Sequence, residues 1–101
     1  MPVSTIKAGK DLIIKFRVPK SRIIEYVVEA ERPVSTWVLD EEGLRQFSNK
    51  RVENVDSYYG GFHRRLNHQQ ELKLPFTGSW YLAIENLDDK NATAVHYEVS
   101  G

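Results

Sequence analysis

Cysteine is absent from this chain of 101 residues, and neither sign of charge is in excess, because 14 basic residues balance 14 acidic ones. The lack of cysteine excludes a disulfide framework and a thiolate zinc site. The zero net charge excludes the general positive field that drives non-specific binding to nucleic acid, so we expect no specific nucleic-acid partner. Apolar runs stay far short of the roughly 20 residues that span a bilayer, and no signal-peptide segment opens the chain. We therefore predict a cytoplasmic protein without a membrane span.

Alternation of apolar and polar residues is the main pattern that is present. A period of two is typical of half-buried β-strands, and here short strands recur with turns too brief for helical crossovers. This predicts one domain over residues 1–101, an all-β antiparallel β-sandwich of jelly-roll or GOLD-like type with about seven or eight strands. The side chains expected in its core are Phe16, Tyr26, Trp37, Trp80, Leu82, Ile84 and Val95.

A proline and a helix candidate are the two local signals that divide the first half of the chain into elements. Pro33 cannot donate to a β-ladder, so Arg32-Pro33 is expected to end one strand before the next begins at Val34. Residues 40–49 then contain the one helix candidate, in which Asp40 can cap the N-terminus and Leu44 and Phe47 are three residues apart. We predict a helix of about two turns there.

Residues 58–65 combine three aromatic rings, a diglycine and a basic end. Arginine binds anionic oxygens through charge-assisted hydrogen bonds, and a neighbouring ring can stack on the attached group. The diglycine allows backbone conformations that are closed to other residues, and a structural turn with its tyrosines packed inward would use the same residues. If the segment is a binding site, its ligand-binding residues are Tyr58, Tyr59, Phe62, His63, Arg64 and Arg65.

Three apolar residues are out of phase with the inward-facing sets. Ile13, Ile23 and Val27 alternate with residues predicted to be buried, so they are expected to face solvent. If their strands are neighbours, the three side chains form one exposed apolar patch, which is typical of a partner interface or a homodimer.

Catalytic sites and metal sites, including a calcium loop, have weaker support in the sequence. No nucleophile elbow is present, and we predict no catalytic residues and no cofactor. His63, His68 and His96 lack a metal-ligand spacing and are interpreted as exposed histidines, so no metal ligands are predicted. The oxygen-rich loop at residues 85–91 could suit calcium, but asparagine and aspartate are also favoured in ordinary turns, which is the interpretation we prefer.

Several short motifs resemble a small bacterial family of all-β domains of unknown function, some members of which are fused to TIR domains. The matching residues are Val38-Leu39-Asp40, Leu44 to Phe47, Tyr58-Tyr59-Gly60-Gly61, Leu74-Pro75 and Gly78-Ser79-Trp80. They lie within residues 34–100. The N-terminal third departs from that family by an additional strand at residues 22–31, and there the chain looks more like a GOLD-type sandwich, a fold used for protein and lipid contacts. The resemblance implies a sandwich with a recognition or accessory role and supplies no catalytic residues.

These observations favour a non-catalytic recognition or accessory domain, bacterial and cytoplasmic, that binds a protein partner or itself and holds a small anion near Arg64. Two other classes stay open. One is a carbohydrate- or lipid-binding module that uses the aromatic residues around Tyr58 to Phe62. The other is a small enzyme or metal-dependent protein.

Overall fold

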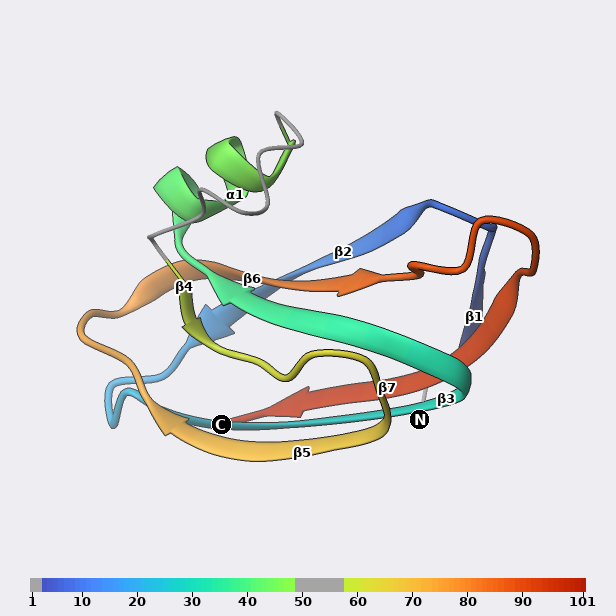
Figure 1. The fold of residues 1–101 in the computed structure, drawn as a ribbon. Helices are drawn as coiled ribbons and strands as arrows, with labels where there is room; N and C mark the ends of the chain where they lie inside the picture. Colours follow the sequence, from blue (N-terminus) through green and yellow to red (C-terminus); the bar gives the residue numbers. More distant parts are fainter. Residues whose placement is uncertain (1–2, 49–57) are drawn as a thin grey trace.

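A computed structural model describes residues 3–48 and 58–101 of the chain. Seven β-strands and one short helix occur in this described part (Figure 1). The strands are β1 (Val3–Ile6), β2 (Asp11–Val18), β3 (Ile23–Leu39), β4 (Tyr58–Gly60), β5 (Arg65–Lys73), β6 (Gly78–Glu85) and β7 (Thr93–Ser100), and the helix is α1 (Glu41–Ser48).

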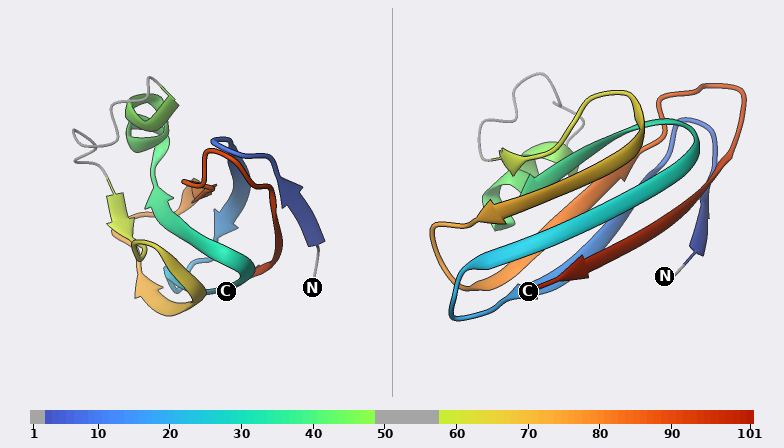
Figure 2. Two further views of the ribbon diagram at one scale, coloured as in Figure 1. Left: turned by 45° about the vertical axis from the view of Figure 1, so that its right-hand side comes forward. Right: turned by 90° about the horizontal axis from the view of Figure 1, so that it is seen from below.

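All strand pairs are antiparallel, and β3 connects two layers. The first half of β3 pairs with β5 and β7, and β7 also pairs with β1. The second half of β3 pairs with β4 and β6, and β6 also pairs with β2. Figures 1 and 2 show β3 turning over so that its two halves lie in different layers. We call these the lower sheet (β5-β3-β7-β1) and the upper sheet (β4-β3-β6-β2). The predicted antiparallel β-sandwich is confirmed.

Pro33 does not end a strand, contrary to the sequence expectation. β3 continues through it to Leu39, and the regular pairing shifts between Glu29 and Val34. Proline is tolerated here because β3 leaves the lower sheet at this point, so no ladder hydrogen bond is required of its nitrogen. The neighbouring Arg32 N–H donates to Thr93 Oγ1 at 3.1 Å, which ties the corner to β7.

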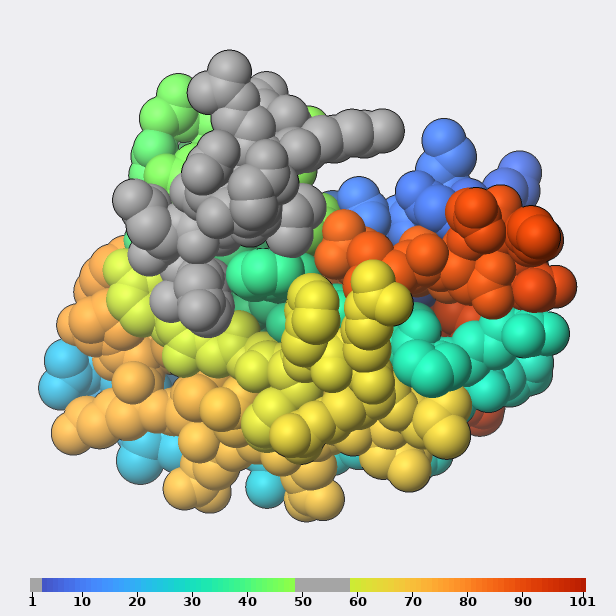
Figure 3. Space-filling view, in the orientation of Figure 1, coloured from blue at the N-terminus to red at the C-terminus, as the bar shows by residue number. Residues whose placement is uncertain are grey.

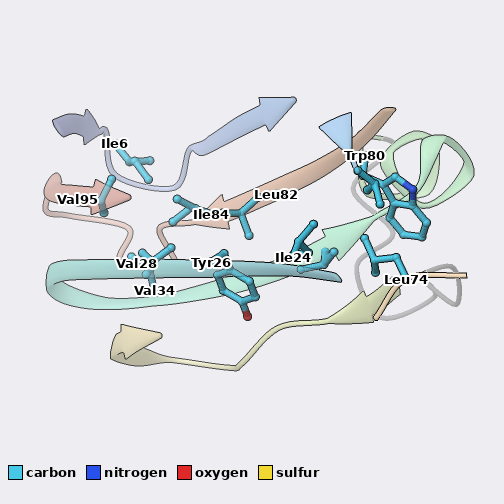
Figure 4. Close-up of a cluster of buried hydrophobic side chains, with 12 residues drawn as sticks. Ile6, Ile24, Tyr26, Val28, Val34, Leu74, Trp80, Leu82, Ile84 and Val95 are labelled. Atoms are coloured by element: carbon cyan, nitrogen blue, oxygen red, sulfur yellow. The ribbon is translucent and has the colours of Figure 1, made fainter. Parts of the chain in front are cut away.

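The core between the layers follows the alternation (Figure 4). Tyr26, Trp80, Leu82, Ile84 and Val95 are buried, as predicted. Phe16 packs against this core but is only half-buried. The reason is its position on β2, which is the outermost strand of the upper sheet, so one flank of its inward face has no further strand to cover it.

Helix α1 covers part of the outer face of the upper sheet. Asp40 caps it, because the Gly43 N–H donates to Asp40 Oδ1 at 2.7 Å. Phe47 is buried against Leu39 and Ala83. Trp37 joins this second cluster from the outer face of β3 and is half-buried, so it is not part of the central core. In residues 3–48 and 58–101, no helix has the length and apolarity to cross a membrane.

Candidate functional site

The segment from β4 to the start of β5 runs along the edge of the upper sheet and is held to β3 by its backbone. Thr36 N–H donates to the Phe62 carbonyl at 2.9 Å, and Phe62 N–H donates to Thr36 Oγ1 at 3.1 Å. Arg64 N–H donates to Ser35 Oγ at 3.1 Å. The segment therefore has a defined path, and in Figure 3 its yellow side chains stand out from the middle of the visible face.

Gly61 makes this path possible. Its φ of 129° lies in a region that side-chain-bearing residues rarely adopt, and a Cβ atom there would lie 2.0 Å from the Thr36 carbonyl oxygen. The close approach of the two backbones therefore requires glycine. This agrees with the structural use of the diglycine that the sequence left open.

A buried polar network lies beneath the segment. His68 Nε2 faces the carbonyls of Val34 at 3.0 Å and Arg65 at 2.9 Å, while its Nδ1 lies 3.0 Å from Thr36 Oγ1. Because both Nε2 partners are acceptors, Nε2 carries the hydrogen, and Nδ1 accepts from the Thr36 hydroxyl. Gln70 Oε1 completes the network by accepting from the Tyr26 hydroxyl and from Gly61 N–H, each at 3.0 Å.

His68 is thus a correction, because the sequence interpretation placed all three histidines on the surface. Burial lowers the pKa of His68 below its usual value and keeps the ring neutral. The phase of β5 could have indicated its position, since His68 and Gln70 precede Leu72 and Leu74 at intervals of two residues. His63 and His96 are exposed, as expected.

Tyr59 joins β4 to the helix. Its ring packs edge-on against Trp80 with the centroids 4.7 Å apart, and its hydroxyl donates to Asp40 Oδ2 at 3.2 Å. Partial burial and the negative charge of Asp40 raise the pKa of Tyr59. The ring is still 40% exposed, so it serves the fold and also reaches the surface. The backbone of Tyr58 opens β4, and its side chain lies outside the described part of the structure.

Phe62 and Arg65 form a stacked pair. The Phe62 ring is half-buried beside the His68 ring, and the Arg65 guanidinium carbon lies 4.1 Å from the Phe62 centroid. A cation over an aromatic face is attracted by the ring quadrupole, and the stacking restricts the arginine side chain. Phe62 is therefore covered on this face and supports Arg65 more than it offers a free stacking surface.

We call the exposed end of the segment, His63, Arg64 and Arg65, the basic tip. Arg64 has a φ of 52°, which turns the chain sharply between its two neighbours. His63 Nδ1 lies 3.3 Å from Ser35 Oγ, and its ring meets Trp37 edge-on with the centroids 6.4 Å apart.

Glu85 is the acidic neighbour of the basic tip. Trp37 Nε1–H donates to Glu85 Oε1 at 3.4 Å, and burial raises the pKa of this carboxyl. The positive charges of His63 and Arg64 act in the opposite direction. The tip is therefore a basic surface bordered by Trp37 and one half-buried acid.

The predicted patch of Ile13, Ile23 and Val27 does not lie across neighbouring strands. Ile13 lies on β2 at the edge of the upper sheet and is 39% exposed. Ile23 and Val27 lie on β3 within the lower sheet, where Ile23 is 42% exposed and Val27 is half-buried. Because each points outward from its own layer, the two sets face opposite sides of the sandwich. The idea of one continuous patch was wrong.

The loop at residues 85–91 is held by its own side chains. Asp88 Oδ1 accepts from the backbone N–H groups of Lys90 and Asn91 at 2.8 and 3.0 Å. The buried Asn86 amide donates to the carbonyls of Ile6, Lys7 and Asn91, which ties the loop to the end of β1. These contacts match the preferred turn interpretation. Among the described residues, no three His, Asp or Glu side chains are arranged to hold a metal ion.

Comparison with known proteins found no protein-family model that matches the chain and no similar curated protein. The resemblance to the bacterial all-β family with the Tyr-Tyr-Gly-Gly motif therefore stays a prediction from the motifs.

Proposed function

We propose that the protein is a non-catalytic recognition domain, which binds a protein partner or itself and holds an anionic group of its ligand at the basic tip. The observation that carries the proposal is the contrast within residues 61–65. Their backbone is fastened to Thr36 and Ser35, whereas the side chains of His63, Arg64 and Arg65 are exposed. Because this backbone is held in place and the Arg65 guanidinium stacks on Phe62, the segment loses less conformational freedom on binding an anion than a flexible segment would.

Ser35 and His63 would be the nearest resemblance to a nucleophile and a base at this place. Ser35 is fully buried, however, and its Oγ accepts the Arg64 N–H. A substrate carbonyl could not reach that oxygen without displacing the tip, so the contact favours a structural role for the serine. The bacterial and cytoplasmic setting of this domain rests on the sequence and stays a prediction.

The test is an NMR titration of the isotopically labelled protein with inorganic pyrophosphate and with a glutamate-rich peptide. We expect salt-dependent shifts centred on the amides of His63, Arg64 and Arg65. The double variant Arg64→Ala/Arg65→Ala should weaken binding at least about tenfold, because hydrogen bonds to charged groups contribute about 1.5–3 kcal/mol each. Its thermal stability should stay near that of the wild type.

The matched control is Lys73→Ala/Lys90→Ala, which removes two exposed positive charges outside the basic tip. Equal loss of binding in both double variants would mean that only net charge matters. Unchanged binding in the arginine variant would mean that residues 58–65 are a structural turn and would refute the proposal.

A carbohydrate-binding role is the second candidate, and it rests on two other rings. Tyr59 and Phe76 both pack on Trp80, with centroids 4.7 and 4.8 Å away, and Phe76 is 46% exposed. Phe76 also lines an open groove of about 970 Å³ between α1 and the β5–β6 turn, together with Asp40, Leu44 and Ser79. Exposed rings beside hydrogen-bonding groups suit a sugar, whose one face is apolar and whose edge carries hydroxyls.

A glycan array and a lipid overlay separate this candidate from the first. Phe76→Ala should abolish any glycan signal, whereas Leu66→Ala, which removes an apolar side chain of the same 46% exposure on β5, should not. Binding to lipid alone, or a signal insensitive to Phe76, would count against the sugar-binding role.

A further inference from the structure

Strand β2 is an unusual edge. It pairs with β6 over its whole length, from Asp11 to Val18, with no register shift, and none of the described residues pairs with its other side. The other outer strands are protected in ordinary ways, since β1 has four residues, β4 has three, and β5 is rich in polar side chains. A long and regular edge strand with an apolar inner face can join another strand unless it is blocked.

The backbone groups on this edge can be assigned from the register. Asn86 N–H donates to the Lys10 carbonyl at 3.0 Å, so this pair is of the hydrogen-bonded type. In an antiparallel ladder the hydrogen-bonded pairs recur at every second residue, so residues 12, 14 and 16 direct their backbone groups to β6. Residues 11, 13, 15 and 17 therefore direct their N–H and C=O groups away from the sheet.

The sequence of this edge is complementary to itself when reversed. With two copies antiparallel and Ile14 opposite Ile14, the half-buried Leu12 meets Phe16 on the inner face of the sheet. On the outer face Ile13 meets Lys15, and Asp11 meets Arg17 of the second copy. Opposite charges directly across a ladder stabilise a strand pair, and this register places inward residues against inward residues.

The inner face of β2 gives such a pairing an apolar component. Leu12, Ile14 and Phe16 pack against the central core but are only half-buried, because β2 is the last strand of its layer. A second copy in the same register would cover these side chains with the same three residues. Hydrogen bonds, apolar contact and charge pairing then all favour one arrangement.

We propose that the protein forms a symmetric dimer in which β2 pairs antiparallel with β2 of a second copy, so that the two upper sheets become one continuous sheet. Ile13 belongs to this interface, and Ile23 and Val27 do not. The inference rests on the self-binding part of the proposed function, which it makes specific, and it does not depend on the basic tip. A single strand pair is a small interface, so we expect a dissociation constant of about 1–100 µM.

Two substitutions at one position test the pairing. Lys15→Pro removes an N–H that points away from β6, whereas Lys15→Ala removes the same side chain and keeps that N–H. In sedimentation equilibrium, Lys15→Ala should dimerise close to the wild-type concentration, and Lys15→Pro should raise the dissociation constant at least about tenfold. Circular dichroism should show the same β content in both variants.

A charge-swap series keeps the inference testable if the proline variant does not fold. Asp11→Arg and Arg17→Asp should each weaken the dimer, because like charges then face each other across the pair, and the double variant should restore it. A wild-type protein that is monomeric at about 1 mM, ten times the weakest constant expected, would overturn the proposal. A dimer that is insensitive to both Lys15→Pro and the charge changes would also overturn it. Anion binding by the basic tip should be the same in all these variants, so either proposal can fail alone.

Discussion

Replacing Gly61 with alanine should destabilise the protein more than the same change at Gly78. Both glycines have a strongly positive φ, 129° and 113°, so both substitutions introduce backbone strain of about 1–3 kcal/mol. They differ in their surroundings. A Cβ at Gly61 would lie 2.0 Å from the Thr36 carbonyl oxygen, whereas a Cβ at Gly78 would meet nothing within 4 Å.

The additional loss of unfolding free energy at Gly61 comes from hydrogen bonds that the new Cβ atom would displace. The segment cannot keep its distance from β3, so the bonds between Thr36 N–H and Phe62 O, between Phe62 N–H and Thr36 Oγ1, and between Gly61 N–H and Gln70 Oε1 are strained or lost. At about 0.5–1.5 kcal/mol for each bond, the extra loss is about 1.5–4.5 kcal/mol. This is a large share of the 5–15 kcal/mol typical of a domain.

Equilibrium unfolding in urea measures the comparison directly, and thermal unfolding should show the same order. We expect Gly61→Ala to have the lower free energy of unfolding by the amount given above, with a similar denaturant slope for both variants. If the two variants lose the same free energy, the close approach of Gly61 to Thr36 contributes nothing to stability, and the reasoning about the diglycine is refuted.

Two further predictions concern buried side chains. Burial lowers the pKa of His68, so the folded state favours the neutral ring. The contribution of the neutral ring to the free energy of unfolding is therefore complete above the pKa of a histidine in the unfolded chain, about 6.5. This contribution is lost as the pH falls through the lower pKa of His68 in the folded state. His68→Gln should therefore flatten the fall in unfolding free energy as the pH drops below about 6.5, and a slope equal to that of the wild type would remove His68 as the cause. Trp80→Ala should cost about 3–5 kcal/mol, because the ring is fully buried, and an unchanged denaturation midpoint would contradict its place in the core.

The structure of residues 58–65 could be predicted only in part from the local sequence. Aromatic, glycine and basic residues within eight positions mark this segment in the sequence, but they do not indicate which of its side chains face inward and which face solvent. Gly61 and Phe62 pack and bond inward, Tyr59 fastens β4 to Asp40, and His63 to Arg65 face outward. That division depends on Thr36, His68 and Gln70, which approach the segment from other strands.

By itself the sequence determined which side chains share a face and where the helix begins. The period of two placed Ile24, Tyr26 and Val28 inward, and Asp40 marked the start of α1. Both are local properties, since side-chain direction alternates along a strand and a cap bonds its own first turn.

Only the tertiary structure decided which strands are neighbours. It placed β2 beside β6 and away from β3, carried β3 past Pro33 into the second layer, and buried His68 under the segment that follows β4. Alternation predicts whether a residue faces inward or outward from its own strand, but it does not predict the partner strand or the layer. The partner strand and the layer are set by contacts between residues far apart in the chain. These contacts place Ile13 in the upper sheet and Ile23 and Val27 in the lower sheet, although all three face outward from their own strands.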